Sequence, residues 1–305
     1  MGEAGLENLK NKTTKKRTIR FTKMQGTGND FVLLDAVSND FCGLDFASLS
    51  RKLLDRHFGV GADQLLVLLP SQEKEKSRLR MRIFNVDGSE VQMCGNGIRC
   101  LAKYIWARGL APKTKKLEIE TLAGIIVPEA KDGLVRVDMG TPRLEGREIP
   151  VQIDGKVIDY PLEIDGARFS ITCVSMGNPH AVIFVEDVAG FPVGLYGPRI
   201  ENHPLFPART NVEFIQVASK GRIKMRVWER GSGETLACGT GASASVVASA
   251  LKGLTSRRVE VELTGGRLDI EWAGDGHVYM TGPAEEVFEG EFFLFFPEEK
   301  EETHV

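Results

Sequence analysis

Two stretches of this 305-residue chain carry the same pattern at an offset of 144 residues (238 − 94). The first, FNVDGSEVQMCGNGIRC, runs from residue 84 to 100, and the second, WERGSGETLACGTGASAS, runs from residue 228 to 245. The offset aligns Cys94 with Cys238, Phe84 with Trp228, Glu90 with Glu234, Gly95 with Gly239, Gly97 with Gly241, and Gly109-Leu110 with Gly253-Leu254. An internal repeat of this kind predicts that the chain folds as two copies of one structural unit.

The repeat extends beyond the two cysteine motifs. MQGTGNDFVLLD and SMGNPHAVIFVED both place Gly-Asn before an apolar strand. GADQLLVLL and RTNVEFIQV occupy similar places between those segments and the cysteines. We therefore interpret the sequence as a divergent duplication, with copies related by pseudo-twofold symmetry and joined in the loop-rich region from residue 140 to 150.

Most of the chain is expected to form short strands, because RLRMRIF, GLVRVDMG and RIKMRVWE alternate apolar and polar residues. A helix is predicted after each cysteine motif. The first ends at Gly109 and has an apolar stripe at Ile98, Leu101, Ala102, Ile105 and Trp106. The second, GASASVVASALKG, is small and apolar on nearly all sides, which suits a helix inside a curved sheet. The expected fold class is α/β (mixed α+β).

Length and composition narrow the choice further. A chain of 305 residues is long enough for two domains. A net charge of −3 and a pI near 6.1 give no reason to expect a nucleic acid or a membrane as partner, and no apolar run approaches the length of a bilayer span. The five cysteines are odd in number and lack a C-x-x-C pair. They favour a reducing, cytoplasmic location over a disulfide framework or a zinc site.

Both ends of the chain differ from its middle. Residues 1–19 are basic and polar and are expected to be a disordered extension. An organellar transit peptide is the alternative, which Glu3 and Glu7 disfavour. Residues 298–305 are expected to be an acidic, solvated tail.

Cysteine at a helix N-terminus has a specific chemistry. The unpaired N–H groups and the helix dipole favour a thiolate, so we expect the pKa values of Cys94 and Cys238 to be lowered toward neutrality. The following glycines let backbone amides approach a carboxylate. In a twofold arrangement the two thiols face each other across a cleft between the halves. Such a pair suits inversion of a carbon by proton exchange, with a base on one face and an acid on the other, and this chemistry needs no metal or cofactor.

These motifs together resemble the diaminopimelate epimerase family, through GTGNDF, GADQLL, FNVDGSEVQMCGNGIRC, GNPH and ERGSGETLACGTGA. The resemblance covers about Arg20 to Phe296. It implies two similar domains, each a curved mixed sheet or barrel wrapped around a central helix. The expected N-terminal half comprises residues 20–138 and 282–297, and the C-terminal half comprises residues 139–281. The implied activity is interconversion of LL- and meso-2,6-diaminopimelate without pyridoxal phosphate, for lysine and peptidoglycan synthesis, by a cytoplasmic homodimer.

The resemblance also implies roles for individual residues. Cys94 and Cys238 match the catalytic pair, and no metal site is expected. The residues expected to surround the substrate are Asn29, Gln64, Asn85, Gly95, Asn96, Asn178, Asn211, Glu229, Arg230, Gly239 and Thr240. Of these, the amides of Gly95-Asn96 and Gly239-Thr240 would bind the reacting carboxylate. His180 and Glu229 match positions near the reacting amino group, and Arg230 could bind the distal carboxylate in bidentate fashion.

Two other functions stay open. One is a related isomerase, either a proline-type racemase, which the asparagines and Arg230 disfavour, or a carbon–carbon double-bond isomerase, which the paired cysteines disfavour. The other is a redox-sensing binding protein that uses facing cysteines as a switch. Exchange of an α-hydrogen with solvent distinguishes an epimerase from a sensor.

Overall fold

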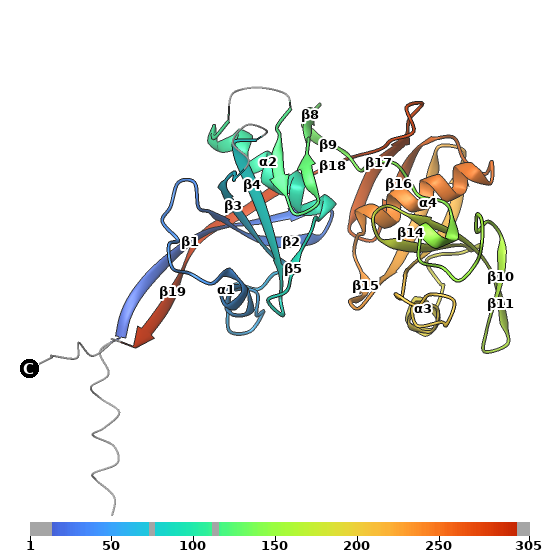
Figure 1. The fold of residues 1–305 in the computed structure, drawn as a ribbon, viewed down its shortest axis with the longest axis horizontal. Coiled ribbons are helices and arrows are strands. Elements are labelled where there is room, and N and C mark those ends of the chain that lie inside the picture. The colour runs from blue at the N-terminus through green and yellow to red at the C-terminus, as the bar shows by residue number, and fades with distance from the viewer. Residues whose placement is uncertain (1–13, 73–76, 112–115, 298–305) are drawn as a thin grey trace, which may run out of the picture.

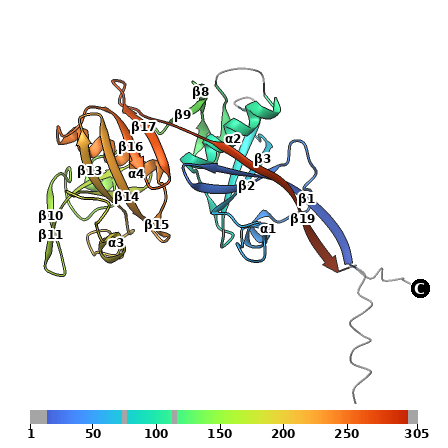
Figure 2. The ribbon, with the colours of Figure 1, turned by 180° about the vertical axis from the view of Figure 1, so that it is seen from behind.

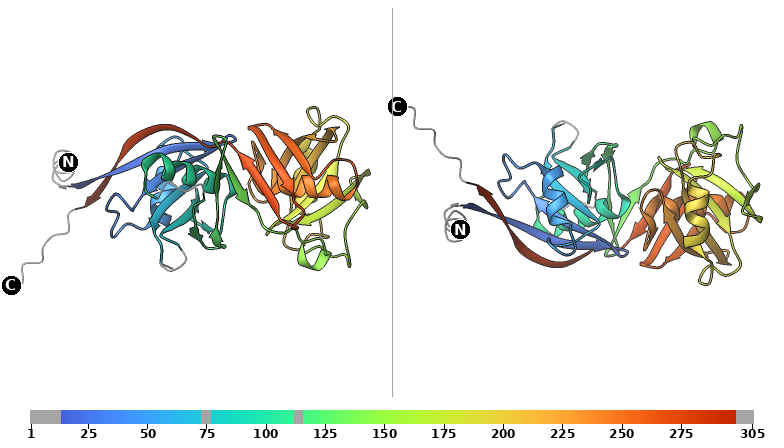
Figure 3. Two further views of the ribbon diagram at one scale, coloured as in Figure 1. Left: turned by 90° about the horizontal axis from the view of Figure 1, so that it is seen from above. Right: turned by 90° about the horizontal axis from the view of Figure 1, so that it is seen from below.

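The computed structural model describes residues 14–72, 77–111 and 116–297. Two sheet-rich halves with few helices lie side by side, the first coloured blue to green and the second yellow to orange (Figure 1). Strand β19 (Glu285–Pro297) returns from the second half to the first (Figure 2). Seen from above and below, the halves lie end to end, and the ribbon formed by β19 and β1 (Thr14–Gly26) extends beyond the first half (Figure 3).

The smaller sheet has the strand order β19-β1-β2-β3-β4-β6-β7, with β5 paired to β4. Strands β2 and β3 run parallel, whereas β3 and β4 run antiparallel, so the start of β2, the start of β3 and the end of β4 meet at one edge. The remaining strands are β2 (Asn29–Asp35), β3 (Gln64–Pro70), β4 (Leu79–Asn85), β5 (Glu90–Val91), β6 (Ile119–Thr121) and β7 (Gly124–Ile126).

The larger sheet has the order β10-β11-β12-β13-β14-β16-β17-β18-β9-β8, with β15 paired to β14. Here β12 and β13 run parallel and β13 and β14 antiparallel, as in the first half. Its strands are β8 (Glu129–Lys131), β9 (Leu134–Asp138), β10 (Tyr160–Ile164), β11 (Ala167–Ser175), β12 (Pro179–Phe184), β13 (Asn211–Ser219), β14 (Arg222–Glu229), β15 (Gly233–Thr235), β16 (Arg258–Leu263), β17 (Gly266–Trp272) and β18 (Val278–Gly282).

Each half wraps strands around one central helix, as predicted. Helix α2 (Gly95–Arg108) packs against β1–β4, β9 and β19, and helix α4 (Gly239–Leu251) against β11–β13 and β16–β18. Four residues of the predicted stripe of α2 are buried and Trp106 is half-buried, and Gly109 ends the helix at φ 64°. In α4 the Ala, Ser and Val side chains are buried on nearly all sides, because only small residues fit where strands surround the helix. Outside the spaces that the strands enclose around α2 and α4 lie α1 (Phe46–Leu53), α3 (Val193–Glu201) and the short 3₁₀ helix η2 (Gly146–Glu148).

The structure confirms the internal repeat at the level of strand pairing. Phe84 pairs with Glu90 between β4 and β5, and Trp228 pairs with Glu234 between β14 and β15. The same offset relates two ion pairs, both with 2.7 Å between Nε and Oε1: Arg82 with Glu90, and Arg226 with Glu234. Equivalent residues therefore hold each cysteine motif in the same way.

Residues 129–138 contact both halves of the molecule. The domain bounds derived from the sequence place β8 and β9 in the N-terminal half, but β9 hydrogen-bonds to β18 of the larger sheet while it also packs on α2. A division between residues 138 and 139 therefore assigns the paired strands β9 and β18 to different halves. The domain bounds stay a prediction.

The prediction of a disordered extension over residues 1–19 is wrong for residues 14–19. These residues begin β1 and pair with β19, with Lys16 opposite Phe295. The partner strand lies at the other end of the sequence, so local composition did not reveal the pairing. Residues 1–13 and the predicted acidic tail at 298–305 lie outside the described residues. Among the helices within the described ranges, none is long and apolar enough to cross a membrane.

Candidate active site

Cys94 is the N-cap residue of α2. Its backbone is extended, and its sulfur accepts a hydrogen bond from the N–H of Gly97 at 3.4 Å. Its thiol also lies 3.7 Å from Asn29 Oδ1, which accepts from it. The sequence prediction that this cysteine opens a helix is confirmed.

Cys238 holds the equivalent place at the start of α4, and its backbone is extended in the same way. Its sulfur lies 3.4 Å from Thr240 Oγ1. Cys238 is only 5% exposed, so its polar partners are mainly protein groups. The two cysteines thus share a position in the repeat but differ in their side-chain partners.

The first turns of the two helices meet. Asn96, in the first turn of α2, donates from Nδ2 to the carbonyl oxygen of Ala237 at 3.4 Å, directly before Cys238. Met280 lies beside both turns, because a Cβ at Gly95 would come within 2.9 Å of its Cε and one at Gly239 within 2.9 Å of its Sδ. The absence of side chains at both glycines therefore permits this close packing.

Glu229 connects the two thiols electrostatically. Burial is the main cause of the raised pKa of both Cys94 and Cys238, and the negative charge of Glu229 adds to it. Burial also raises the pKa of Glu229, and the hydrogen bond from Thr235 opposes that effect. One carboxylate from the second half therefore lies within electrostatic reach of the thiol from each half.

The predicted lowering of the thiol pKa values is wrong. Burial raises the pKa of Cys94, and the backbone N–H groups of Gly97 and Asn96 offset this only in part. Burial also raises the pKa of Cys238 well above its usual value, with Glu229 and Glu213 adding to the rise. The helix N-terminus does act in the expected direction, but desolvation of a buried thiolate is the larger effect.

The polar residues predicted in the first half lie at the edge where three strands meet. Asn29 begins β2, Gln64 begins β3, and Asn85 ends β4. Gln64 Nε2 donates to Asn85 Oδ1 at 2.9 Å, and Asn29 Oδ1 accepts from Asn96 Nδ2 at 3.3 Å. Asn29 therefore lies at the start of α2 beside Cys94, and Gln64 and Asn85 lie at the same edge of the sheet.

The second half repeats this arrangement. Asn178 directly precedes β12, Asn211 begins β13, and Glu229 ends β14. Asn211 Oδ1 accepts from the backbone N–H of Arg230 at 2.9 Å. The Arg230 side chain is exposed and donates from Nη1 to the carbonyl oxygen of Ala208 at 3.0 Å.

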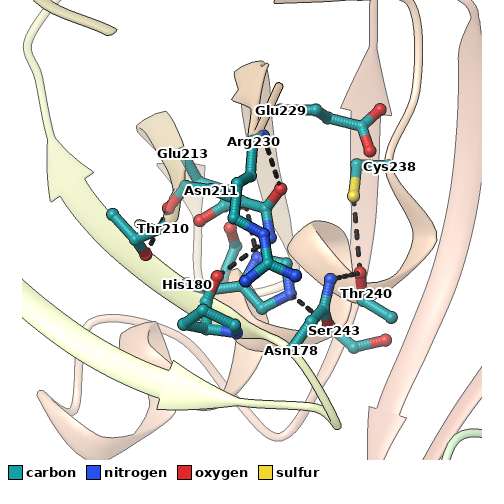
Figure 4. Close-up of polar contacts among 12 residues, drawn as sticks. Asn178, His180, Thr210, Asn211, Glu213, Glu229, Arg230, Cys238, Thr240 and Ser243 are labelled. Carbon is teal, nitrogen blue, oxygen red and sulfur yellow. Dashed lines mark hydrogen bonds and ion pairs between the residues drawn. The ribbon is translucent and has the colours of Figure 1, made fainter. Parts of the chain in front are cut away.

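His180 is fully buried, at 0% exposure, and its Nδ1 lies 2.7 Å from Oε1 of the equally buried Glu213. Its other ring nitrogen contacts Asn178 (Figure 4). His180 therefore reaches the site through Asn178, and its contacts are with protein groups.

Several residues that support the site were not predicted. Asp63 Oδ2 accepts from Asn29 Nδ2 at 2.9 Å and so fixes the orientation of that amide. Glu213 contacts His180, and Thr235 donates to Glu229. A signal did exist for Glu213, which is an acidic residue in the otherwise apolar strand NVEFIQV. Asp63 and Thr235 stand in loop-like, polar stretches and carry no such signal.

Two thiols, the carboxylate of Glu229 and the backbone amides of two helix N-termini lie near the contact between the first turns of α2 and α4. Two thiols and a carboxylate can exchange protons, and the amides can bind an anion. Within residues 14–72, 77–111 and 116–297, no three His, Cys, Asp or Glu side chains gather closely enough to hold a metal ion.

Comparisons with known proteins agree with this arrangement. The sequence model of the family described as "Diaminopimelate epimerase" matches residues 21–145 and 172–287. The diaminopimelate epimerase of Pelotomaculum thermopropionicum is 57% identical over 280 residues, covering 90% of this chain and 99% of that protein. That of Moorella thermoacetica is 56% identical over 283 residues, covering 90% and 100%.

Solved structures show that the fold is shared more widely. A hydroxyproline epimerase from Agrobacterium vitis superimposes with a TM-score of 0.66 at 15% identity, covering 92% of this chain and 94% of that one. A PhzF-family phenazine biosynthesis protein from Bacillus anthracis gives 0.64 at 17% identity, covering 90% and 99%. From the family match and the close relatives together, this chain belongs to the diaminopimelate epimerase family.

Proposed function

We propose that this protein is an isomerase that interconverts LL- and meso-2,6-diaminopimelate by cofactor-independent proton exchange between Cys94 and Cys238. The observation that carries the proposal is the contact of the two helix N-termini, where Asn96 of α2 donates to the carbonyl before Cys238. Each repeat delivers one thiol to that contact. The choice of diaminopimelate as the substrate rests on the relatives of that name, which are more than 50% identical to this chain.

Inversion of a carbon centre requires one proton to leave from one face and another to arrive on the opposite face. A single base tends to return the proton to the face from which it came, whereas two thiols on opposite sides avoid this. The raised pKa values favour the thiol form of both cysteines, so each can serve as the acid, and the one that serves as the base must first lose its proton. In the proposed cycle that cysteine, as a thiolate, takes the α-proton from one face of the carbon. The other cysteine, as a thiol, gives its proton to the opposite face, and the two have then exchanged protonation states.

To the amides of Gly95-Asn96 and Gly239-Thr240 we assign the stabilisation of the charge that develops on the reacting carboxylate. These residues form the first turns of α2 and α4, where backbone N–H groups lack helical partners. Glu229 could accept a hydrogen bond from the reacting ammonium, because it lies within reach of both thiols. Met280, packed against both turns, limits the water that reaches this place.

The distal head of the substrate requires its own recognition. Asn29, Gln64, Asn85, Asn178 and Asn211 can donate and accept around a zwitterion, and they come from the strand ends of both halves. We assign the distal carboxylate to Arg230, whose exposed guanidinium needs to exchange only its contact with Ala208. This assignment separates the protein from a proline-type racemase, whose substrate has no second carboxylate.

The experiment is a proton-exchange assay in deuterium oxide across a small panel of amino acids. We expect solvent deuterium at the inverted α carbon of the meso product formed from LL-diaminopimelate, and little in proline or in monocarboxylic diamines. Absence of exchange with diaminopimelate, or faster exchange with proline, would refute the proposal. A redox-sensing protein would exchange none of them, and its two thiols would instead form a disulfide on mild oxidation.

We further propose a cytoplasmic homodimer that acts in lysine and peptidoglycan precursor synthesis. The five cysteines are free, as in reducing compartments. Strand β19 forms an edge of the smaller sheet, and Phe293 and Phe295 on it are 43% and 62% exposed. Exposed apolar residues on an edge strand are typical of an association surface. Sedimentation of Phe295→Glu tests this, since an unchanged mass would remove the strand from the interface; cell fractionation tests the location.

A further inference from the structure

A row of hydrogen bonds runs from the carboxylate of Glu213 to the sulfur of Cys238 (Figure 4). Glu213 Oε1 lies 2.7 Å from His180 Nδ1, and His180 Nε2 lies 2.9 Å from Asn178 Oδ1. Asn178 Nδ2 donates to Thr240 Oγ1 at 3.3 Å, and Thr240 Oγ1 lies 3.4 Å from Cys238 Sγ. The row therefore joins β13, β12 and the residue before β12 to the first turn of α4.

The amide of Asn178 determines the direction of the row. Its carbonyl oxygen can only accept, so His180 Nε2 carries a hydrogen and donates it. Its nitrogen can only donate, so Thr240 Oγ1 accepts from it. Glu213 occupies the other ring nitrogen of His180 and thereby holds the ring with Nε2 toward Asn178.

The contact between Thr240 Oγ1 and Cys238 Sγ can run in either direction while Cys238 carries its proton. A thiolate has no hydrogen, so once the proton has left, the sulfur can only accept. The hydroxyl of Thr240 already accepts from Asn178, which leaves its own hydrogen free to point at the sulfur. Toward the thiolate, Thr240 is therefore the donor and Cys238 Sγ the acceptor.

We propose that Thr240 is a positioning residue whose hydroxyl stabilises the thiolate of Cys238, and that Glu213, through His180 and Asn178, holds this hydroxyl in the donating direction. The proposal rests on the proposed function for its role in the reaction, since Cys238 must lose its proton once in each cycle. The donor remains in place when the proton leaves, so it contributes more to the thiolate than to the thiol.

The charged groups around Cys238 make such a donor necessary. Glu229 faces the thiol from β14 and Glu213 from β13, and both carboxylates raise its pKa in addition to burial. The Thr240 hydroxyl and the backbone N–H of Gly241 act in the opposite direction. His180 on β12 faces Glu213, with 2.7 Å between Nδ1 and Oε1. Without Thr240 the thiolate would have one stabilising hydrogen bond fewer in a negative environment.

Cys94 has no equivalent donor among the described side chains. The residue at the same offset from Thr240 is Asn96, whose amide nitrogen donates to Asn29 and to the carbonyl of Ala237. The Cys94 thiol itself donates to Asn29. In the described part of the chain, a side-chain hydroxyl donor is therefore present at Cys238 and not at Cys94, and removing it should leave the reactivity of Cys94 unchanged.

The test measures the reactivity of Cys238 without substrate, in a Cys94→Ala background. The alkylation rate by iodoacetamide is followed from about pH 6.5 to about pH 9.5, because only the thiolate reacts. Mass spectrometry separates the Cys238 peptide from that of Cys42, which is exposed and serves as an internal reference. Thr240→Val removes the hydroxyl while keeping the shape, and Thr240→Ser keeps the hydroxyl.

We expect Thr240→Val to slow alkylation of Cys238 by about tenfold at a given pH, the effect of one hydrogen bond to a charged group. Thr240→Ser should react within about threefold of its parent. In a Cys238→Ala background, Thr240→Val should leave alkylation of Cys94 unchanged. Should the valine variant fail to fold by circular dichroism, Thr240→Ala replaces it with the same expected loss.

A double-mutant cycle tests the direction of the row. Asn178→Asp provides only acceptors, so it would take the hydrogen of the Thr240 hydroxyl away from the sulfur. The negative charge that Asn178→Asp introduces also slows the alkylation of Cys238. The test therefore uses the interaction between the two substitutions, not the effect of Asn178→Asp alone. We expect Thr240→Val to have almost no further effect in a protein that already carries Asn178→Asp.

Three results would overturn the inference: equal reactivity of the valine and parent proteins, equal loss in valine and serine variants, or additive effects in the cycle. Failure of the proposed function would look different, since the unmodified protein would then show no α-hydrogen exchange with diaminopimelate while the dependence of Cys238 on Thr240 persisted.

Discussion

Replacement of Gly241 by alanine probes the packing beneath Cys238. A Cβ at this position would lie 2.6 Å from Glu213 Oε1 and 3.2 Å from both Cδ and Cγ of the same side chain. Glu213 is 0% exposed and is held by His180, so the carboxylate must move by several tenths of an ångström with nowhere to relax. The repeat supplies a matched control, because Gly97 occupies the same place at the 144-residue offset (241 − 97).

The two substitutions differ in what they displace. At Gly97 the added carbon would meet Leu66 Cδ2 at 3.0 Å, the end of a flexible side chain, and Cys94 Cβ at 3.4 Å. Both variants gain up to about 1 kcal/mol from replacing glycine in a helix. Overpacking against a rigid group costs about 1–3 kcal/mol. We therefore expect Gly241→Ala to lose about 1–2 kcal/mol in free energy of unfolding relative to Gly97→Ala.

Urea denaturation of both variants beside the parent measures this difference. The kcat/KM of Gly241→Ala should also fall by about 10- to 100-fold, because displacement of Glu213 misplaces His180 and Asn178 next to Cys238. Equal stability of the two variants, or a Gly241→Ala protein more stable than the parent, would refute the reasoning. It would mean that Glu213 is free to move and does not hold the residues above it.

Two further predictions concern charged residues. Arg230→Ala should raise the KM for diaminopimelate by about 10- to 100-fold, because a bidentate pair with the distal carboxylate is lost; equal losses with a substrate lacking that carboxylate would remove Arg230 from the distal site. Burial alone would raise the pKa of Asp30, but hydrogen bonds from Arg56 and Lys23 outweigh it and hold the pKa at about 2, below its usual 3.8. Because the pKa is depressed in the folded protein, this group contributes about 2 kcal/mol above pH 4 that is lost as the pH falls toward 2. Urea midpoints against pH should show that loss in the parent and a smaller one in Arg56→Ala, and identical profiles would contradict the assignment.

Much of the fold could be predicted from local pattern. The 144-residue repeat predicted two equivalent halves, and the match of Phe84–Glu90 with Trp228–Glu234 appears as equivalent strand pairs. The small residues after Cys238 predicted a helix inside a curved sheet. What escaped prediction depends on distant partners: β1 begins at Thr14 because β19, at the other end of the chain, pairs with it.

The site shows a similar limit. The cysteines were predictable because the motif appears twice, whereas the strand-end amides were predicted from the resemblance to the family. The thiol pKa values were not, since a helix terminus is visible in a sequence whereas the desolvation that outweighs it depends on how the two halves pack. Asp63 and Glu213 escaped for a related reason. Their roles follow from strand register, which places Asp63 beside Asn29 and Glu213 beside His180.

In the proposed mechanism two thiols act on one carbon from opposite faces. Its most direct test is the reaction of LL-diaminopimelate in deuterium oxide, stopped at early conversion, with the label measured separately in product and in remaining substrate. We predict that the meso product carries solvent deuterium at the inverted carbon while the remaining LL substrate keeps its hydrogen, because the proton that leaves and the one that arrives use different sulfur atoms. Product that retains the original hydrogen would contradict the mechanism, since one group would then have carried the same proton between the two faces.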